Sequence, residues 1–229
     1  MTAAAGPQLA RILDPLPLAN NDAELRRRLG YPADGASRTW PAPVEEALLA
    51  GRPHLAPRGV FALYPVGRSS SRGIELDGHW LAGRIGEFFA GAARVAVFVA
   101  TVGAEISELA RAAAARGDSL ASFTLDALGS WATEAAADAL MLAIEAQLQP
   151  GEALSQRHSP GYCSMSLATQ QNLFALIDAA AVGVSLNPAL MMTPLKSVSG
   201  LVALGPETNW AASLSPCATC EDLACPARR

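Results

Sequence analysis

The chain alternates between short apolar runs and longer amphipathic segments from residue 59 onward. The short runs are rich in β-branched and aromatic residues and are bounded by glycines or turn residues, which predicts strands. One of them surrounds the turn pair Asp77-Gly78, which predicts a strand that enters a tight turn. The segments predicted as strands are 59–67, 71–80, 94–103, 182–191 and 198–205.

The longer segments repeat their apolar residues at helical spacing and several end at a glycine. In the longest of them Leu120, Phe123, Leu128 and Trp131 recur at spacings of three to five, which gives one apolar face. The segments predicted as helices are 21–30, 42–51, 81–92, 104–117, 118–149 and 166–183.

Strands and helices are interspersed without a strict β-α repeat. This order predicts an α+β fold in which helices flank a single twisted, mixed or antiparallel sheet. The organisation that we expect is a helical N-terminal extension over 1–58, an α+β core over 59–214 and a Cys-rich C-terminal tail over 215–229.

Composition narrows the classes of partner. The chain has 229 residues, 51% of them hydrophobic, and a net charge of −4, so a packed core is expected and no global basic field is available for nucleic acid. The first 22 residues lack the apolar core of a secretory signal, and the run 94–103 is far shorter than a membrane-spanning helix. We therefore expect a cytoplasmic protein that has neither nucleic acid nor membrane as a partner.

Three of the four cysteines crowd the C-terminus as Cys217, Cys220 and Cys225. Thiolates at such short spacing can converge on one ion, which indicates a zinc site or an iron–sulfur cluster. The fourth ligand would be Cys163, water or substrate. The alternatives are a structural zinc knot or free thiols.

The stretch "RHSPGYCSMS", from Arg157 to Ser166, places a cation, a proline, a glycine and a tyrosine within six residues. As an ordinary loop it is a Pro-Gly turn with a surface arginine. A second unusual segment is "MMTPLKSVSG", from Met191 to Gly200. The two segments flank one predicted helix, 166–183. The two segments would line a cleft if they met, and the small residues of the second would let a large flat ligand approach the backbone.

Together these segments, with "QNLFALID" and "LDALGSWATEAAAD", resemble the activation domain of cobalamin-dependent methionine synthase. The family pattern RxxxGY is matched by Arg157, Gly161 and Tyr162. A later methionine, proline and Ser-Val-Ser-Gly are matched by Met192, Pro194 and residues 197–200. The similarity extends over residues 95–205.

The resemblance implies a domain that binds S-adenosylmethionine and rescues cobalamin that has slipped to cob(II)alamin. An electron from a flavodoxin or ferredoxin-like donor and a methyl group from S-adenosylmethionine would regenerate methylcobalamin. As a standalone reactivation factor, the protein would act on a corrinoid-carrying methionine synthase that lacks its own activation domain. A cluster on the cysteine tail would be a second route for the electron.

The resemblance also implies residue roles. Arg157 would bind the methionine carboxylate of the cofactor, and the chain at His158, Ser159 and Pro160 would lie along the ligand beside Gly161. Tyr162 would stand near the sulfonium methyl group or the corrin face, as a catalytic residue that acts by positioning. The residues expected to face the corrin are Ser197, Val198, Ser199 and Gly200. The family's acidic residue for the cofactor amino group has no matching motif, and Glu75 and Asp77 are the two candidates.

Two other functions remain open from the sequence. The first is a binding module that keeps the fold but senses S-adenosylmethionine or serves another corrinoid protein or methyltransferase. The second is an unrelated metal-binding or redox protein centred on the cysteine tail.

Overall fold

The computed structural model describes residues 10–19, 22–32, 39–162 and 165–206. It contains one large, wholly antiparallel sheet with strand order β4-β3-β2-β5-β9-β6, and β1 pairs with the first part of β2 on the side opposite β5. The strands of this sheet are β1 (Arg11–Leu13), β2 (Arg58–Ser70), β3 (Gly73–Leu76), β4 (His79–Ala82), β5 (Arg94–Thr101), β6 (Glu152–Leu154) and β9 (Ser197–Pro206). A separate small hairpin joins β7 (Ser185–Leu186) to β8 (Met192–Thr193).

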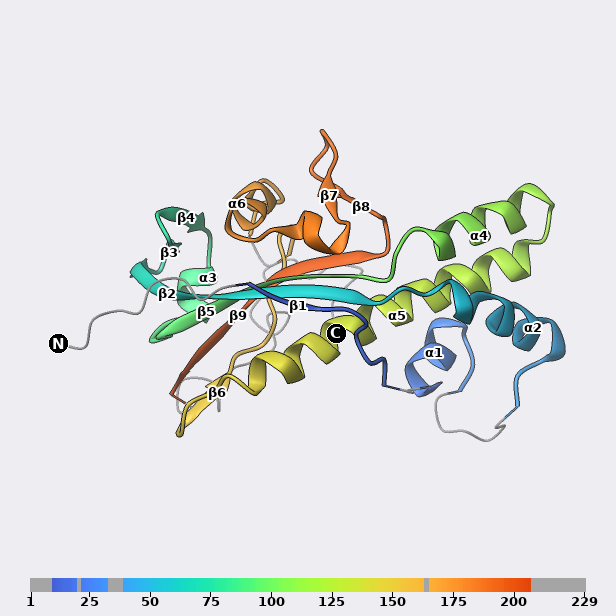
Figure 1. Cartoon of the computed structure of the whole chain (residues 1–229), viewed down its shortest axis with the longest axis horizontal. Coiled ribbons are helices and arrows are strands. Elements are labelled where there is room, and N and C mark those ends of the chain that lie inside the picture. The colour runs from blue at the N-terminus through green and yellow to red at the C-terminus, as the bar shows by residue number, and fades with distance from the viewer. Residues whose placement is uncertain (1–9, 20–21, 33–38, 163–164, 207–229) are drawn as a thin grey trace.

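Helices cover both faces of the sheet (Figure 1). The long helix α5 (Ser119–Glu145) lies across one face, together with α1 (Asp22–Arg28), α2 (Ala42–Gly51) and α4 (Glu105–Ala115). The other face carries α3 (Ile85–Phe88), α6 (Thr169–Leu176) and the short 3₁₀ helix η2 (Ala179–Val182); a second one, η1 (Arg52–His54), follows α2. The prediction of an α+β fold with helices flanking one sheet is confirmed.

The central strand β5 shows why the sequence reads as a continuous apolar run. Phe98 and Ala100 belong to the core beneath α5, whereas Val97 and Val99 belong to the core beneath α6. Successive side chains of a strand point to opposite faces, so a strand covered by helices on both sides needs apolar residues at every position.

Two predicted helices differ in the structure. Residues 81–92 contain the end of β4 and only the short helix α3, because Gly83 adopts a positive φ of 123° and breaks the backbone between them. The segment 166–183 divides into α6 and η2, because Ile177 is extended and the Asp178 side chain caps a new helical turn at Ala181. Neither break has a strong signal in the hydrophobic pattern.

Two strands of the large sheet were missed by the pattern. The extension expected to be helical over 1–58 does contain α1 and α2, but it also contributes β1, which pairs with β2. The predicted loop 150–165 contains β6, which pairs with the end of β9. Each has only three residues, too few to show a period of two, and forms because a longer strand offers unpaired backbone groups.

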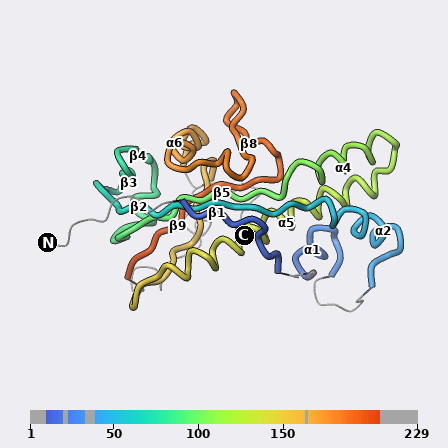
Figure 2. The backbone as a smooth tube through the Cα atoms, viewed as in Figure 1, coloured from blue at the N-terminus to red at the C-terminus, as the bar shows by residue number. Residues whose placement is uncertain are grey.

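After β6 the chain continues along the same edge of β9 before entering α6, as Figure 2 shows. In the described part of the chain no helix is both long and apolar enough to cross a membrane.

Candidate functional site

The two segments singled out in the sequence meet along β9. The Ser155 N–H donates to the Ala203 carbonyl at 2.9 Å, and His158 exchanges two backbone hydrogen bonds with Leu201, at 2.9 and 2.8 Å. A Cβ atom on Gly200 would lie 2.7 Å from the His158 carbonyl oxygen and 2.9 Å from Cζ of Phe98. Glycine at position 200 therefore lets the segment after β6 lie directly against the strand.

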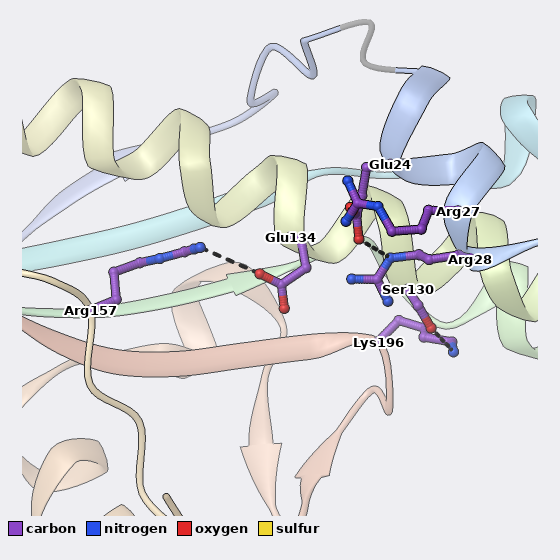
Figure 3. Close-up of polar contacts among 7 residues, drawn as sticks. All are labelled: Glu24, Arg27, Arg28, Ser130, Glu134, Arg157 and Lys196. Carbon is purple, nitrogen blue, oxygen red and sulfur yellow. Dashed lines mark hydrogen bonds and ion pairs between the residues drawn. The ribbon is translucent and has the colours of Figure 1, made fainter. Parts of the chain in front are cut away.

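The Arg157 side chain extends from this edge toward α5 (Figure 3). Its Nη2 lies 3.4 Å from Oε2 of Glu134 and 3.1 Å from Oδ1 of Asp138. These two carboxylates are one helical turn apart on α5, and all three side chains are partly exposed to solvent. The site thus combines one guanidinium with two carboxylates at the protein surface.

The same side of α5 carries a longer polar stripe, which we define as Asp126, Ser130, Glu134 and Asp138. These residues are spaced by four, so they follow one another along the helix. Lys196, just before β9, contacts the first half of the stripe, with Nζ 2.7 Å from Oδ1 of Asp126 and 2.8 Å from Oγ of Ser130. Arg157 contacts the second half.

Sequence reasoning missed this stripe as part of the site. Its spacing of four was visible, but a polar stripe on a long helix ordinarily indicates only the solvent face. Of the two acids suggested from sequence, Glu75 forms an ion pair with Arg68 at the opposite part of the sheet. The acids that lie beside Arg157 are instead Glu134 and Asp138.

His158 points in the opposite direction from Arg157, into the protein. Its ring stacks on Phe88 with centroids 4.6 Å apart and meets Phe89 edge to face at 5.2 Å. Burial between these rings lowers the pKa of His158 from 6.5 to about 4. The His158 side chain therefore anchors the segment and does not face this edge.

We expect His158 to make stability depend on pH. Because its pKa is depressed in the folded state, the contribution is fully present above pH 6.5 and is lost as pH falls toward 4. The shift corresponds to about 3 kcal/mol of unfolding free energy. Denaturant unfolding of wild type and His158→Phe at several pH values between 4 and 7 should show a smaller loss in the variant. The half-buried His54→Gln is the control. Equal slopes in wild type and His158→Phe would contradict the assignment.

The remaining residues of the first segment form its turn. Gly161 has a φ of 87°, and its N–H donates to the Met165 carbonyl at 2.8 Å, which closes the turn. Ser159 is half-buried and Pro160 is buried, while Tyr162 is exposed at the tip. The structure therefore presents the Tyr162 ring to solvent, where it is free to contact a partner.

Of the four residues in the second segment that were expected to face the corrin, not all are exposed at the surface. Ser199 is buried, and its hydroxyl donates to Oε1 of Gln170 at 3.2 Å; Gly200 is buried under His158. Ser197 and Val198 are half-buried, and Oγ of Ser197 lies 2.9 Å from Oγ1 of Thr101. Successive residues alternate between the two faces of the sheet, so they do not form one continuous surface.

The three tail cysteines Cys217, Cys220 and Cys225 and the predicted fourth ligand Cys163 lie outside the described residues. Within the described ranges, no group of three or more histidine, cysteine, aspartate or glutamate side chains has the arrangement of a metal site. The metal site of the tail stays a prediction.

Comparison with known proteins places this chain in a family. Residues 89–212 match the family described as vitamin B12 dependent methionine synthase, activation domain, and this is more than half of the chain. The chain belongs to this activation-domain family. The match includes α5, the Arg157 segment and β9, so both sequence motifs lie within it.

A solved structure supports the same fold for the activation domain. The crystal structure titled as the MetH reactivation domain bound to AdoHcy matches with a TM-score of 0.58 and 18% sequence identity. The match covers 87% of this chain and 79% of that chain, so it extends beyond residues 89–212 into the N-terminal region. At this identity the similarity shows the fold. No curated protein matches this chain.

Proposed function

We propose that this protein binds S-adenosylmethionine between the Arg157 segment and α5, and that it supports reductive methylation of cob(II)alamin held by a partner corrinoid protein. Methionine synthase is the first candidate for that partner. Membership of the activation-domain family supports the reaction class. The observation that carries the location is the contact of Arg157 with Glu134 and Asp138.

This cluster fits the amino acid end of the cofactor. That end carries a carboxylate and an ammonium group on one carbon, so it needs a cation and an anion side by side. Arg157 supplies a fork of donors for the carboxylate. Glu134 and Asp138 supply acceptors for the ammonium group, and their partial exposure lets a ligand reach them. Binding would exchange a contact within the protein for an equivalent contact with the ligand.

The protein contributes binding and orientation in this proposal. S-adenosylmethionine supplies, when bound, a methyl group on a positively charged sulfur. Each methylation uses one electron from the donor and one methyl group, and leaves S-adenosylhomocysteine. The exposed Tyr162 follows the anchoring arginine by five residues, and its ring combines an apolar face with a polar tip. Tyr162 would therefore orient the reacting end or the corrin by contact, without proton transfer.

The proposed reaction requires a source for this electron. A flavodoxin or ferredoxin-like protein is the proposed donor, and a cluster on Cys217, Cys220 and Cys225 is the alternative relay. Both are inferred from sequence and family, as is the cytoplasmic location.

The proposal is tested in two steps. Isothermal titration calorimetry should detect saturable binding of S-adenosylmethionine to one site. With a corrinoid protein in the cob(II)alamin state and a low-potential reductant, absorbance spectra should show methylcobalamin only when both this protein and S-adenosylmethionine are added. Absence of binding contradicts the proposal. Binding without methylation would instead favour a sensing module or service to another corrinoid protein.

A further inference from the structure

Lys196 is the only lysine in the sequence, although the chain has sixteen arginines. Its side chain is only 10% exposed and crosses from the start of β9 to α5. Both contacts of its ammonium group, with Asp126 and Ser130, lie on the polar stripe. A compact ammonium fits between one carboxylate and one hydroxyl, where the larger planar guanidinium of arginine would not have the same geometry.

Gly129 completes a socket for this lysine. A Cβ atom at position 129 would lie 3.2 Å from both Cγ and Cε of Lys196, so the lysine stem rests on bare helix backbone. Gly129 lies inside the 27-residue helix α5, where glycine is less favourable than alanine. The close approach of the stem gives this glycine a physical reason. We name Asp126, Gly129 and Ser130 the lysine socket.

The backbone of Lys196 is held as firmly as its side chain. Its carbonyl accepts hydrogen bonds from the Val102 N–H at 3.1 Å and from Oγ1 of Thr101 at 3.3 Å. The next residue is fixed too, because Oγ of Ser197 lies 2.7 Å from the Pro194 carbonyl oxygen. Lys196 therefore joins the beginning of β9 to α5 and to the end of β5.

This junction matters for the site because the cation of the site is attached to β9 and its carboxylates belong to α5. The Arg157 segment is attached to β9 through the hydrogen bonds between His158 and Leu201. The carboxylates of Glu134 and Asp138 belong to α5, and Ser130 precedes Glu134 by one turn (Figure 3). The distance between the guanidinium and the carboxylates thus depends on how β9 sits on α5.

We propose that Lys196 is a positioning residue that sets, through the lysine socket, the separation between Arg157 and the carboxylates of α5. This inference rests on the proposed function, because that separation determines whether a carboxylate and an ammonium group on one carbon are bound together. Lys196 makes no contact with the ligand in this role. It determines the preference of the site for an amino acid end.

The test compares two ligands that share the adenosine part. S-adenosylhomocysteine carries the amino acid end, whereas 5′-methylthioadenosine lacks it. Lys196→Met keeps most of the stem and removes the ammonium group. We expect it to weaken S-adenosylhomocysteine binding about tenfold, within the range for coupled neighbours, and to leave 5′-methylthioadenosine binding within about twofold. Equal weakening of both ligands, or of neither, would overturn the proposal.

A double-mutant cycle gives a second readout that needs only one ligand. If Lys196 acts through Arg157, Lys196→Met should have no further effect on S-adenosylhomocysteine affinity in an Arg157→Gln background. Independent, additive losses would refute the coupling. The wild-type titration separates the two hypotheses: a wild type that binds no S-adenosylhomocysteine contradicts the proposed function, whereas a binding wild type with an unaffected Lys196→Met variant contradicts only the positioning role.

Discussion

Arg157→Ala is expected to weaken S-adenosylmethionine binding by about 10- to 100-fold, as for the loss of a hydrogen bond to a charged group. The substitution removes the cation proposed for the ligand carboxylate. It also leaves Glu134 and Asp138 unbalanced beside that carboxylate, which adds repulsion. Isothermal titration calorimetry measures the loss directly.

The same substitution should hardly change stability, and this separates binding from folding. The side chains of Arg157, Glu134 and Asp138 are 30%, 47% and 69% exposed, and ion pairs with this exposure contribute at most about 1 kcal/mol. Arg111→Ala, on the exposed side of α4, is the matched control and should affect neither property. A variant at 157 that binds S-adenosylmethionine as tightly as wild type would disprove the location of the site.

Gly200→Ala is expected to lower the free energy of unfolding by about 3 kcal/mol, the upper end for overpacking a well-packed core. The added Cβ atom would meet the His158 carbonyl oxygen at 2.7 Å and the Phe98 ring at 2.9 Å. The backbone at His158 cannot move away without losing its hydrogen bonds to Leu201. Urea denaturation with a fixed m-value measures the effect.

Gly67→Ala is the matched control, because it also lies in a strand but its Cβ atom would have no neighbour closer than 3.4 Å. It should cost less than about 1 kcal/mol. Since the His158 backbone carries Arg157 beside it, Gly200→Ala should also weaken ligand binding. Similar stabilities for the two alanine variants would show that the segment after β6 does not lie against β9 as described.

Much of the fold could be predicted from local patterns because the elements concerned are long or strongly apolar. The core strands β2, β5 and β9 and the helices α4 and α5 all follow from hydrophobic spacing and terminal glycines. The short strands β1 and β6 could not be predicted. They exist because β2 and β9 present backbone groups for pairing, and nothing in three residues records that a partner is available.

The residues of the candidate site also fall into those that the sequence predicted and those that it did not. The anchoring arginine and the Ser-Val-Ser-Gly strand are contiguous motifs, so sequence alone singled them out. His158 was expected along the ligand, and the structure places its imidazole between Phe88 and Phe89, which are about 70 residues earlier. Glu134 and Asp138 were missed because they resemble the solvent face of a helix until Arg157 is seen beside them.

The sequence by itself determined the class of fold, which depends on short-range periodicity. It also determined the two motifs by which the chain resembles its family, because these depend only on residue order along the chain. Only the tertiary structure decided which charges share a site, which motif residues are buried and which side chains the one lysine contacts. Those properties arise from contacts between residues 20 to 100 positions apart, such as Arg157 with Glu134 and Lys196 with Asp126. Local sequence patterns do not predict such long-range contacts, because these form only when the helices and strands pack together.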